Sequence, residues 1–456
     1  MPEYDVIVIG AGPAGEVCSG RLAEEGLQVC LVERELVGGE CAYWACMPSK
    51  ALLRPGQLLK EDARVPGARE AVTGPLDVAS ALKRRDQVIH NLDDSAQMPW
   101  LEQRGVTLVR GPARLDGERR VTVGDELLQA RRAVVIATGS GAAIPPVPGL
   151  AEIAPWTNRQ GTNANEVPAR LTVLGGGAVG CELAQAWASL GARVMLVEAR
   201  PPLLPGEEPF ASELLGQGMA ELGVDVRTGA KAVEATRDEH EHTFTLTLES
   251  GEQIVADELL VAVGRVPHTG DLGLETVDLA PGETIAVDDR MRVRDHETWL
   301  YAVGDVNGRA LLTQAAKYQA QIACATIMNR EAHAVWDGKL TPRVAFTEPQ
   351  VASVGYTLAE ALAEGIEAQA VDADPGKTPG ASFIGKGAPS AARIVVDERR
   401  EVIIGATIVG PDVAESLQAA TIAIVGEVPL RRLAHAMPAF PTRSEVWLKL
   451  LAGWAP

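Results

Sequence analysis

One pattern occurs twice in this chain of 456 residues and sets most of what it can fold into. Residues 6–15 and 171–180 each consist of a β-branched run, a glycine-rich turn and the start of a helical stretch. In each copy a second strand follows and ends in a glutamate, Glu33 or Glu198, 23 positions after the first glycine of the turn. Two such units predict an α/β protein with two Rossmann-like dinucleotide-binding domains.

The glycines of each turn have separate tasks. The first makes a tight turn, the second lets the backbone approach a pyrophosphate, and the third lets the helix pack on the strand. The glutamate lies at the spacing of a ribose-binding acid. A carboxylate accepts hydrogen bonds from a free ribose 2′-OH and repels a 2′-phosphate, so Glu198 favours NADH. NADPH stays as the alternative, because Arg200 lies two residues on and would offset part of that repulsion.

Charge and composition exclude several classes of partner. The net charge is −19, which argues against nucleic acid and against an anionic membrane surface. No apolar run approaches the roughly 20 residues that span a bilayer. A strand begins almost at the N-terminus, which predicts no processed targeting peptide and a cytoplasmic location. Six cysteines in a large chain of this kind do not form a disulfide framework, so any disulfide is expected to be catalytic or redox-sensing.

Two of the cysteines, Cys41 and Cys46, lie five positions apart just before a predicted helix start, with Pro48 suited to its first turn. A thiol near a helix N-terminus sees unpaired N–H groups and the positive dipole end, which favour a thiolate. The spacing alone is compatible with two buried structural cysteines and with a small disulfide that closes and reopens.

Joints rich in proline and glycine, at residues 143–149 and 263–270, predict the domain boundaries. The first dinucleotide-binding domain is expected at residues 1–146 and the second at 147–270. The chain then returns to the first domain at 271–338, where another strand ends in a Gly-Asp turn. A last region covers 339–456, in which residues 393–397 and 402–409 are predicted to be adjacent strands.

These features together resemble the flavin-dependent pyridine nucleotide–disulfide oxidoreductases, the group of dihydrolipoamide dehydrogenase, glutathione reductase and mercuric reductase. The resemblance covers essentially the whole chain. It rests, in order, on residues 10–33, 39–50, 137–139, 175–198, 264–265, 304–305 and 343–349. It implies FAD in the first domain, NAD(P)H in the second and an α+β dimerisation domain at the C-terminus, and hence a homodimer in which one subunit completes the other's active site.

The resemblance also assigns roles to residues. Cys46 is the thiol expected to face the flavin, Cys41 the one expected to exchange with substrate, and Lys50 with Glu182 the ion pair beside the flavin. A cation there would stabilise the negative charge of reduced flavin. Glu33 is expected on the adenosine ribose and Asp305 on the ribityl chain. The full set of expected cofactor-binding residues is Gly10, Gly12, Pro13, Ala14, Gly15, Glu33, Arg34, Gly39, Glu40, Lys50, Ala113, Ala137, Thr138, Gly139, Gly175, Gly177, Ala178, Val179, Gly180, Glu198, Ala199, Gly264, Asp305, Leu312 and Thr313.

The C-terminal segment departs from the family pattern. Disulfide reductases of this group carry His-Pro-Thr-x-x-Glu, and this chain has Phe440 at the histidine position while keeping Glu445, a further expected catalytic residue. Phenylalanine cannot carry a proton. His435 lies five residues upstream, with no reason in its offset to place it in the site. The C-terminal cysteines of mercuric reductases and the redox tail of large thioredoxin reductases are also absent, since no cysteine follows Cys324.

A second departure lies inside the cysteine loop, where Tyr43 and Trp44 replace small residues and either pack beneath the loop or face substrate. The leading hypothesis is an FAD enzyme that passes hydride from NAD(P)H through the flavin to the cysteine pair and on to a small-molecule acceptor. A quinone or dye reductase, or a transhydrogenase, in which flavin alone carries turnover is the alternative within enzymes. A weakly active redox-sensing flavoprotein is the alternative from another class. No metal site is predicted.

Overall fold

The computed structural model describes residues 1–294, 299–335, 337–385 and 387–454. The chain divides into two compact units, each assembled from separate stretches. The first unit comprises Met1–Pro48, Asp86–Ala142 and Arg265–Thr341, and the second comprises Ser49–Arg85, Ala143–Gly264 and Pro342–Pro456. The four domain segments predicted from the sequence joints stay a prediction.

The first unit is built on a sheet with the strand order β3-β2-β1-β6-β5-β4, in which β16 also pairs with β6. Strand β1 runs parallel to β2 and to β6, as a βαβ unit requires. The strands are β1 (Glu3–Ile9), β2 (Val29–Glu33), β3 (Thr107–Arg110), β4 (Ala113–Leu115), β5 (Arg120–Val123), β6 (Glu126–Ile136) and β16 (Leu300–Ala302), with a separate pair formed by β7 (Ser140–Ala142) and β15 (Arg265–Pro267).

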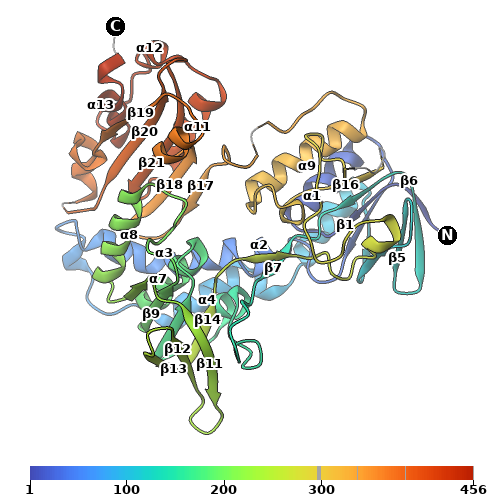
Figure 1. Ribbon diagram of the computed structural model, residues 1–456, viewed down its shortest axis with the longest axis horizontal. Helices are drawn as coiled ribbons and strands as arrows, with labels where there is room; N and C mark the ends of the chain where they lie inside the picture. Colours follow the sequence, from blue (N-terminus) through green and yellow to red (C-terminus); the bar gives the residue numbers. More distant parts are fainter. Residues whose placement is uncertain (295–298, 336, 386, 455–456) are drawn as a thin grey trace. The chain divides into compact units, whose positions relative to one another are not determined.

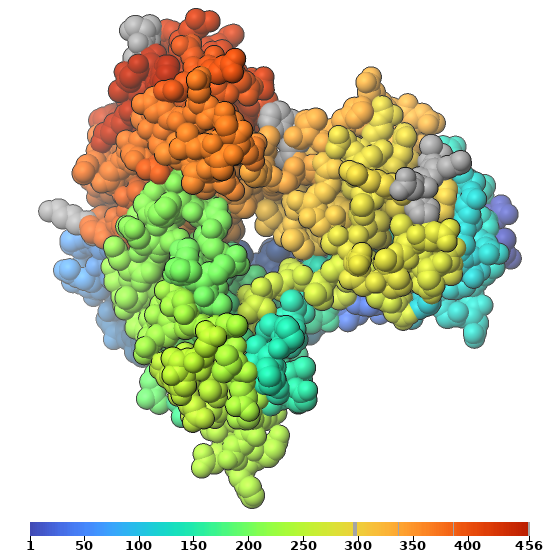
Figure 2. Space-filling model, viewed as in Figure 1, coloured from blue at the N-terminus to red at the C-terminus, as the bar shows by residue number. Residues whose placement is uncertain are grey.

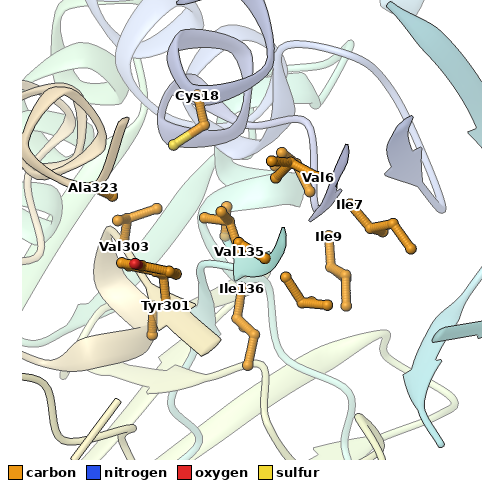
Figure 3. Packing of buried hydrophobic residues seen from close by; sticks show 14 of the residues in the cluster. Val6, Ile7, Ile9, Cys18, Val135, Ile136, Tyr301, Val303 and Ala323 are labelled. Carbon is orange, nitrogen blue, oxygen red and sulfur yellow. The ribbon is translucent and has the colours of Figure 1, made fainter. Parts of the chain in front are cut away.

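Helices α1 (Pro13–Glu24) and α9 (Thr313–Ile327) lie side by side in this unit although they are far apart in the sequence (Figure 1). Both contribute to the core around β1 and β6, where Cys18 of α1 and Ala323 of α9 join strand residues such as Val135 (Figure 3). The remaining helices up to residue 104 are α2 (Gly39–Tyr43), α3 (Cys46–Asp62), α4 (Val78–Val88) and α5 (Met98–Arg104); α3 begins in the first unit, and α4 ends in it.

The second unit repeats the same device in its parallel sheet, whose strand order is β10-β9-β8-β14. Helix α7 follows β8, and its Trp187 side chain is fully buried in the core. A three-stranded antiparallel sheet, β11-β12-β13, carries a hairpin that projects into solvent (Figure 2). The elements are α6 (Asn158–Asn163), β8 (Arg170–Leu174), α7 (Ala178–Ser189), β9 (Arg193–Glu198), α8 (Pro209–Glu221), β10 (Asp225–Thr228), β11 (Ala232–Asp238), β12 (Thr243–Leu248), β13 (Gln253–Ala256) and β14 (Glu258–Val261).

The C-terminal part of the second unit is a five-stranded antiparallel sheet in the order β17-β18-β21-β20-β19, with α11 packed on β21 and β18 (Figure 1). The two strands predicted at residues 393–397 and 402–409 are neighbours, as β20 and β21. The elements are β17 (Arg343–Ala345), β18 (Gln350–Gly355), α10 (Leu358–Ala363), β19 (Ala368–Ala373), β20 (Ala391–Asp397), β21 (Val402–Gly410), α11 (Leu417–Val425), α12 (Leu430–Leu433) and α13 (Val446–Leu450).

The predicted α/β class, with two dinucleotide-binding βαβ units followed by an α+β domain, is confirmed. Among the described residues, no helix combines the length and the apolar character needed to cross a membrane.

Candidate active site

The two cysteines of the sequence motif come together at the start of α9. Cys41 lies in the short helix α2, and Cys46 is the first residue of α3. The Thr313 hydroxyl donates to Cys41 Sγ at 3.2 Å, and its oxygen lies 3.5 Å from Cys46 Sγ. Both side chains are thiols and are partly exposed. The chain therefore places a dithiol around one hydroxyl group, within reach of solvent.

The dithiol changes the acidity of Cys41. A hydrogen bond with the Cys46 thiol, followed by burial, raises the pKa of Cys41 well above the ordinary thiol value. The Thr313 hydrogen bond and the positive charge of Lys317 act in the opposite direction but are outweighed. In the dithiol form, the hydrogen bond with Cys46 and desolvation therefore act against the thiolate that a helix start was expected to favour.

The two aromatic residues of the cysteine loop pack with each other. Their ring centroids are 5.7 Å apart and the planes are tilted by 58°. Tyr43 is almost fully buried, and its hydroxyl donates to the Val37 carbonyl oxygen at 3.0 Å. For Tyr43 the structure favours the interpretation that it packs beneath the loop, because its one polar atom is already used in the interior.

The first glycine turn has the geometry of a dinucleotide cradle. A Cβ added at Gly10 would overlap the Ala137 carbonyl, and one at Gly15 would overlap the Gly10 carbonyl. A Cβ at Gly12 would meet nothing within 4 Å. Gly10 and Gly15 are therefore demanded by packing within the chain, whereas Gly12 leaves open space at the N-terminus of α1, which is the kind of place that suits a pyrophosphate.

Glu33 closes the same turn from the end of β2. Its Oε2 accepts the Ala11 N–H at 2.6 Å and its Oε1 accepts the Glu35 N–H at 2.7 Å. These bonds fix the buried carboxylate next to the glycine turn, and each oxygen keeps a lone pair that can accept a ribose hydroxyl. The position agrees with the predicted ribose contact. Gly39 also lies against this turn, since a Cβ on it would be 2.7 Å from the Gly12 Cα.

The second glycine turn reproduces this arrangement in the other unit. An added Cβ at Gly175 would overlap the Ala262 carbonyl and one at Gly180 the Gly175 carbonyl, while Gly177 faces open space. Glu198 Oε2 accepts the Gly176 N–H at 2.6 Å, and its Oε1 accepts the Arg200 N–H at 2.8 Å. Each unit therefore has a cradle that fits one dinucleotide.

Lys50 and Glu182 form the predicted ion pair, with Nζ and Oε2 2.7 Å apart. Glu182 is buried on α7 and also accepts the Phe346 N–H at 2.9 Å and the Ser49 hydroxyl at 3.3 Å. The ammonium lies 4.7 Å from the centre of the Phe346 ring. A buried carboxylate thus fixes one partly exposed cation. The contribution of Phe346 was missed, although it lies in the 343–349 run that the sequence singled out.

Asp305 lies at the turn that follows β16. Its Oδ2 accepts the Ser140 hydroxyl at 2.5 Å, and Arg265 Nε lies 3.6 Å from the same oxygen. Arg265 also donates to the Ser140 hydroxyl at 2.7 Å and approaches Glu40 Oε1 at 3.9 Å. This cluster orients one carboxylate from residues scattered over the chain. A role for Ser140 was not predicted from the sequence, where the one indication of it is the position directly after the 137–139 motif.

The other expected cofactor contacts fall near these turns. Pro13 and Ala14 open α1, Ala178 and Val179 open α7, and Leu312 precedes α9. Thr138 donates to the His268 carbonyl at 2.9 Å beside Gly139, which has a positive φ, as has Gly264. Three of the expected residues lie at strand ends: Arg34 and Ala199, both exposed, directly after β2 and β9, and Ala113 at the first position of β4.

The C-terminal motif carries Phe440 at the position where the resemblance predicts a histidine. Phe440 is 75% exposed, and His435 is exposed as well. Glu445 Oε2 is buried and has no hydrogen-bond partner among the described residues. In the part of the chain that the structure describes, no imidazole donates a hydrogen bond to this oxygen.

Comparison with known proteins agrees with these features. The model of the pyridine nucleotide–disulphide oxidoreductase family matches residues 4–320, and that of its dimerisation domain matches residues 341–451. Dihydrolipoyl dehydrogenase 3 of Pseudomonas aeruginosa is 33% identical over 98% of this chain and 96% of its own length. Mercuric reductase of Acidithiobacillus ferrooxidans is 32% identical over 99% of this chain and 82% of its own length.

Solved structures show the same fold. The HOCl-induced flavoprotein disulfide reductase RclA from Escherichia coli superposes with a TM-score of 0.86 at 24% identity, covering 98% of this chain and 99% of that one. LpdA from Mycobacterium tuberculosis superposes with a TM-score of 0.85 at 24% identity, and the match covers both chains completely. At this identity the likeness concerns the fold alone.

Proposed function

Because the chain belongs to the pyridine nucleotide–disulphide oxidoreductase family, we propose that it reduces a small disulfide through the Cys41–Cys46 pair. Members of this family are enzymes that bind FAD and NAD(P)H, and the predicted family, enzyme class and cofactors are confirmed. The single observation that carries the proposal is the meeting of both thiols at Thr313, one of them hydrogen-bonded to its hydroxyl. A purely structural pair would have no reason to stay partly exposed as thiols.

The two cradles supply the binding step. We assign FAD to the turn around Gly12 and NADH to the turn around Gly177, since both leave room for a pyrophosphate at a helix N-terminus. The chemistry that bound FAD would supply is acceptance of hydride from the nicotinamide and transfer of an electron pair to the Cys41–Cys46 disulfide. The Asp305 carboxylate, oriented by Ser140 and Arg265, is available to accept a hydroxyl of the ribityl chain.

The thiols carry the exchange step. Cys41 as a thiolate attacks one sulfur of the substrate disulfide, forming a mixed disulfide and releasing the first product thiol. Cys46 then attacks Cys41 Sγ, which releases the second product thiol and restores the Cys41–Cys46 disulfide. The two thiol protons leave with the two product thiols. The Thr313 hydroxyl donates to whichever sulfur carries the charge, which lowers the cost of a thiolate without taking up a proton.

Lys50 has an electrostatic role in this proposal. Its charge is held by buried Glu182 and would be available to stabilise negative charge on the flavin without proton transfer. The C-terminal region adds a homodimer, for which the matched dimerisation domain is the support. Several large apolar side chains of that region are exposed in the single chain and would be covered in a dimer: Phe383, Ile422, Val425, Met437, Phe440 and Leu448. Cytoplasmic location stays a prediction.

A second candidate is a quinone or dye reductase in which the flavin alone carries turnover. Phe440 favours this candidate, because the exposed phenylalanine cannot take up or release the protons of the dithiol, as the histidine expected at this position would. A weakly active redox-sensing flavoprotein is the third candidate. It predicts reduction by NADH with slow transfer to every acceptor.

One titration separates these candidates. The purified protein is reduced anaerobically with NADH while flavin absorbance is followed, and small disulfides and quinones are then supplied in turn. Cys41→Ser is expected to abolish disulfide reduction and to leave quinone reduction intact. Phe440→His is expected to raise disulfide turnover. Equal rates for the wild type and Cys41→Ser on every acceptor would refute the dithiol route, and light scattering of the same sample reports whether it is a dimer.

A further inference from the structure

The turn that carries Asp305 is held from behind by one buried side chain. Gln319, on the second turn of α9, is fully buried. Its Oε1 accepts the Gly304 backbone N–H at 2.8 Å and the Asn307 side-chain amide at 2.8 Å. The residues on both sides of Asp305 are thus attached to the same oxygen. Gly304 has a φ of 81°, a backbone conformation that residues other than glycine seldom adopt. This conformation directs its N–H toward Gln319.

The other end of the Gln319 amide is fixed as well. Its Nε2 donates to Asp337 Oδ2 at 3.0 Å, and the Asp337 side chain has no exposed surface. Arg309 neutralises this carboxylate through two contacts, 2.7 Å from Nε to Oδ2 and 2.8 Å from its terminal nitrogen to Oδ1. The charged groups around the amide are therefore Asp337 and Arg309, with Asp289 reaching Arg309 from the exposed side at 3.1 Å.

This pattern requires an amide at position 319. Two donors point at Oε1 and an acceptor faces Nε2, so only a side chain with an acceptor at one end and a donor at the other satisfies all three. A carboxylate of nearly the same shape would keep the first two bonds but would face the Asp337 carboxylate at about 3 Å. An aliphatic side chain would leave the Gly304 N–H without a partner in the interior.

We propose that Gln319 is a positioning residue for FAD, which fixes the Gly304–Asn307 turn so that Asp305 faces the cofactor, and that Asp337 and Arg309 hold the amide in that orientation. The proposal rests on the function proposed above, in which Asp305 contacts the ribityl chain. It also ties FAD retention to Asp337, which lies in the segment between α9 and the C-terminal region. This segment thereby contributes to the flavin site through Gln319.

The test is the Gln319→Glu variant, with Gln321→Glu as the control. Gln321 lies on the same helix but is exposed, so the control introduces the same charge outside the network. FAD affinity is measured by diluting the holoprotein and following flavin fluorescence. At about pH 8.5, Gln319→Glu is expected to bind FAD about 10- to 100-fold more weakly than wild type, and Gln321→Glu like wild type.

Acid is expected to rescue the variant. A buried carboxylate beside Asp337 has a raised pKa, and its protonated form donates to Asp337 and accepts from Gly304 as the amide does. At about pH 5.5 the affinity should return to within about 3-fold of wild type. Normal affinity at both pH values would overturn the proposal. Loss at both pH values would overturn it too, because a protonated carboxyl that restores the hydrogen-bond pattern of the amide would then have failed to restore FAD binding.

A second condition and a further variant keep the test decisive. If Gln319→Glu does not fold at about pH 8.5, the same variant is refolded with FAD at about pH 5.5, where the protonated carboxyl should restore folding and FAD affinity; failure at that pH counts against the proposal. Asp305→Ala separates the two levels of inference. Undiminished FAD affinity in Asp305→Ala refutes the role proposed for Asp305, whereas weak binding there with normal binding in Gln319→Glu refutes only the positioning role.

Discussion

Gly177 and Gly180 offer a matched pair of alanine substitutions that separates the ligand-binding task of a glycine from its packing task. Both lie at the start of α7 in the second unit, three residues apart. A Cβ at Gly177 meets nothing within 4 Å, and the backbone there has φ −75° and ψ 179°, which alanine adopts without strain. A Cβ at Gly180 would overlap the Gly175 carbonyl oxygen at well under 3.0 Å.

The expected magnitudes follow from these contacts. Gly177→Ala should leave stability within about 1 kcal/mol of wild type, because alanine restricts the unfolded chain but is a poorer N-cap than glycine. It should nonetheless weaken NADH binding about tenfold or more, since the methyl group occupies the space that the pyrophosphate needs. Gly180→Ala has to move α7 by about 1 Å from the glycine turn to reach ordinary contact, which costs about 1–3 kcal/mol, as overpacking does.

Denaturant unfolding of the purified variants measures their stability, and stopped-flow reduction of the flavin over a range of NADH concentrations measures their affinity for NADH. The expected outcome is a crossed result: Gly177→Ala folds normally and binds NADH poorly, while Gly180→Ala unfolds at lower denaturant. Unchanged NADH affinity in Gly177→Ala would refute the assignment of this turn to the nicotinamide nucleotide. Wild-type stability in Gly180→Ala would refute the close contact between helix and turn.

Two other predictions concern the reacting groups. Lys50→Met should slow flavin reduction and destabilise the protein, because it leaves the buried Glu182 carboxylate without its cation. Adding Glu182→Gln removes that charge and keeps an acceptor for the Phe346 N–H, so it should recover the unfolding midpoint but not the rate; recovery of both would show that the pair is only structural. The raised pKa of Cys41 means that its thiolate, followed by ultraviolet absorbance of the reduced protein, forms at higher pH than that of an ordinary cysteine. Lys317→Gln removes a charge that lowers this pKa and should shift the titration further up, whereas Lys317→Arg should not; a shift downward would contradict the assignment.

The parts of the site that could be predicted from the sequence are those built by neighbouring residues. The glycine turns, the acids that close them and the helix start at Cys46 all depend on contacts within about 25 positions, and spacing alone encodes them. The contact of Thr313 with both thiols spans more than 260 positions, and that of Glu182 with the Phe346 N–H spans 164. Only the resemblance to a family placed Thr313 and Glu182 near the flavin, and nothing in the sequence indicated these contacts.

Gln319 shows why the supporting residues escape a reading of sequence. It stands in the middle of a helical stretch, where a glutamine is an ordinary choice with high helix propensity and no motif. Its role arises only because α9 turns this position toward the loop after β16 and because Asp337 returns to the same place. Buried amides of this kind are recognised by counting donors and acceptors in the folded chain.

The two cradles also show how a repeated local device is put to different uses. In both cradles the first glycine lies against a backbone carbonyl, that of Ala137 or Ala262, and the third glycine lies against the carbonyl of the first. The acid accepts the N–H of the residue that directly follows the first glycine. They differ in what approaches from outside. Gly39, two residues before Cys41, lies against Gly12 in the first cradle, whereas the second turn packs against Leu203 at Gly176. A ligand in the first cradle is therefore coupled through a direct backbone contact to the segment that carries the dithiol. This asymmetry favours the first cradle as the flavin site on grounds that the duplicated motif itself cannot provide.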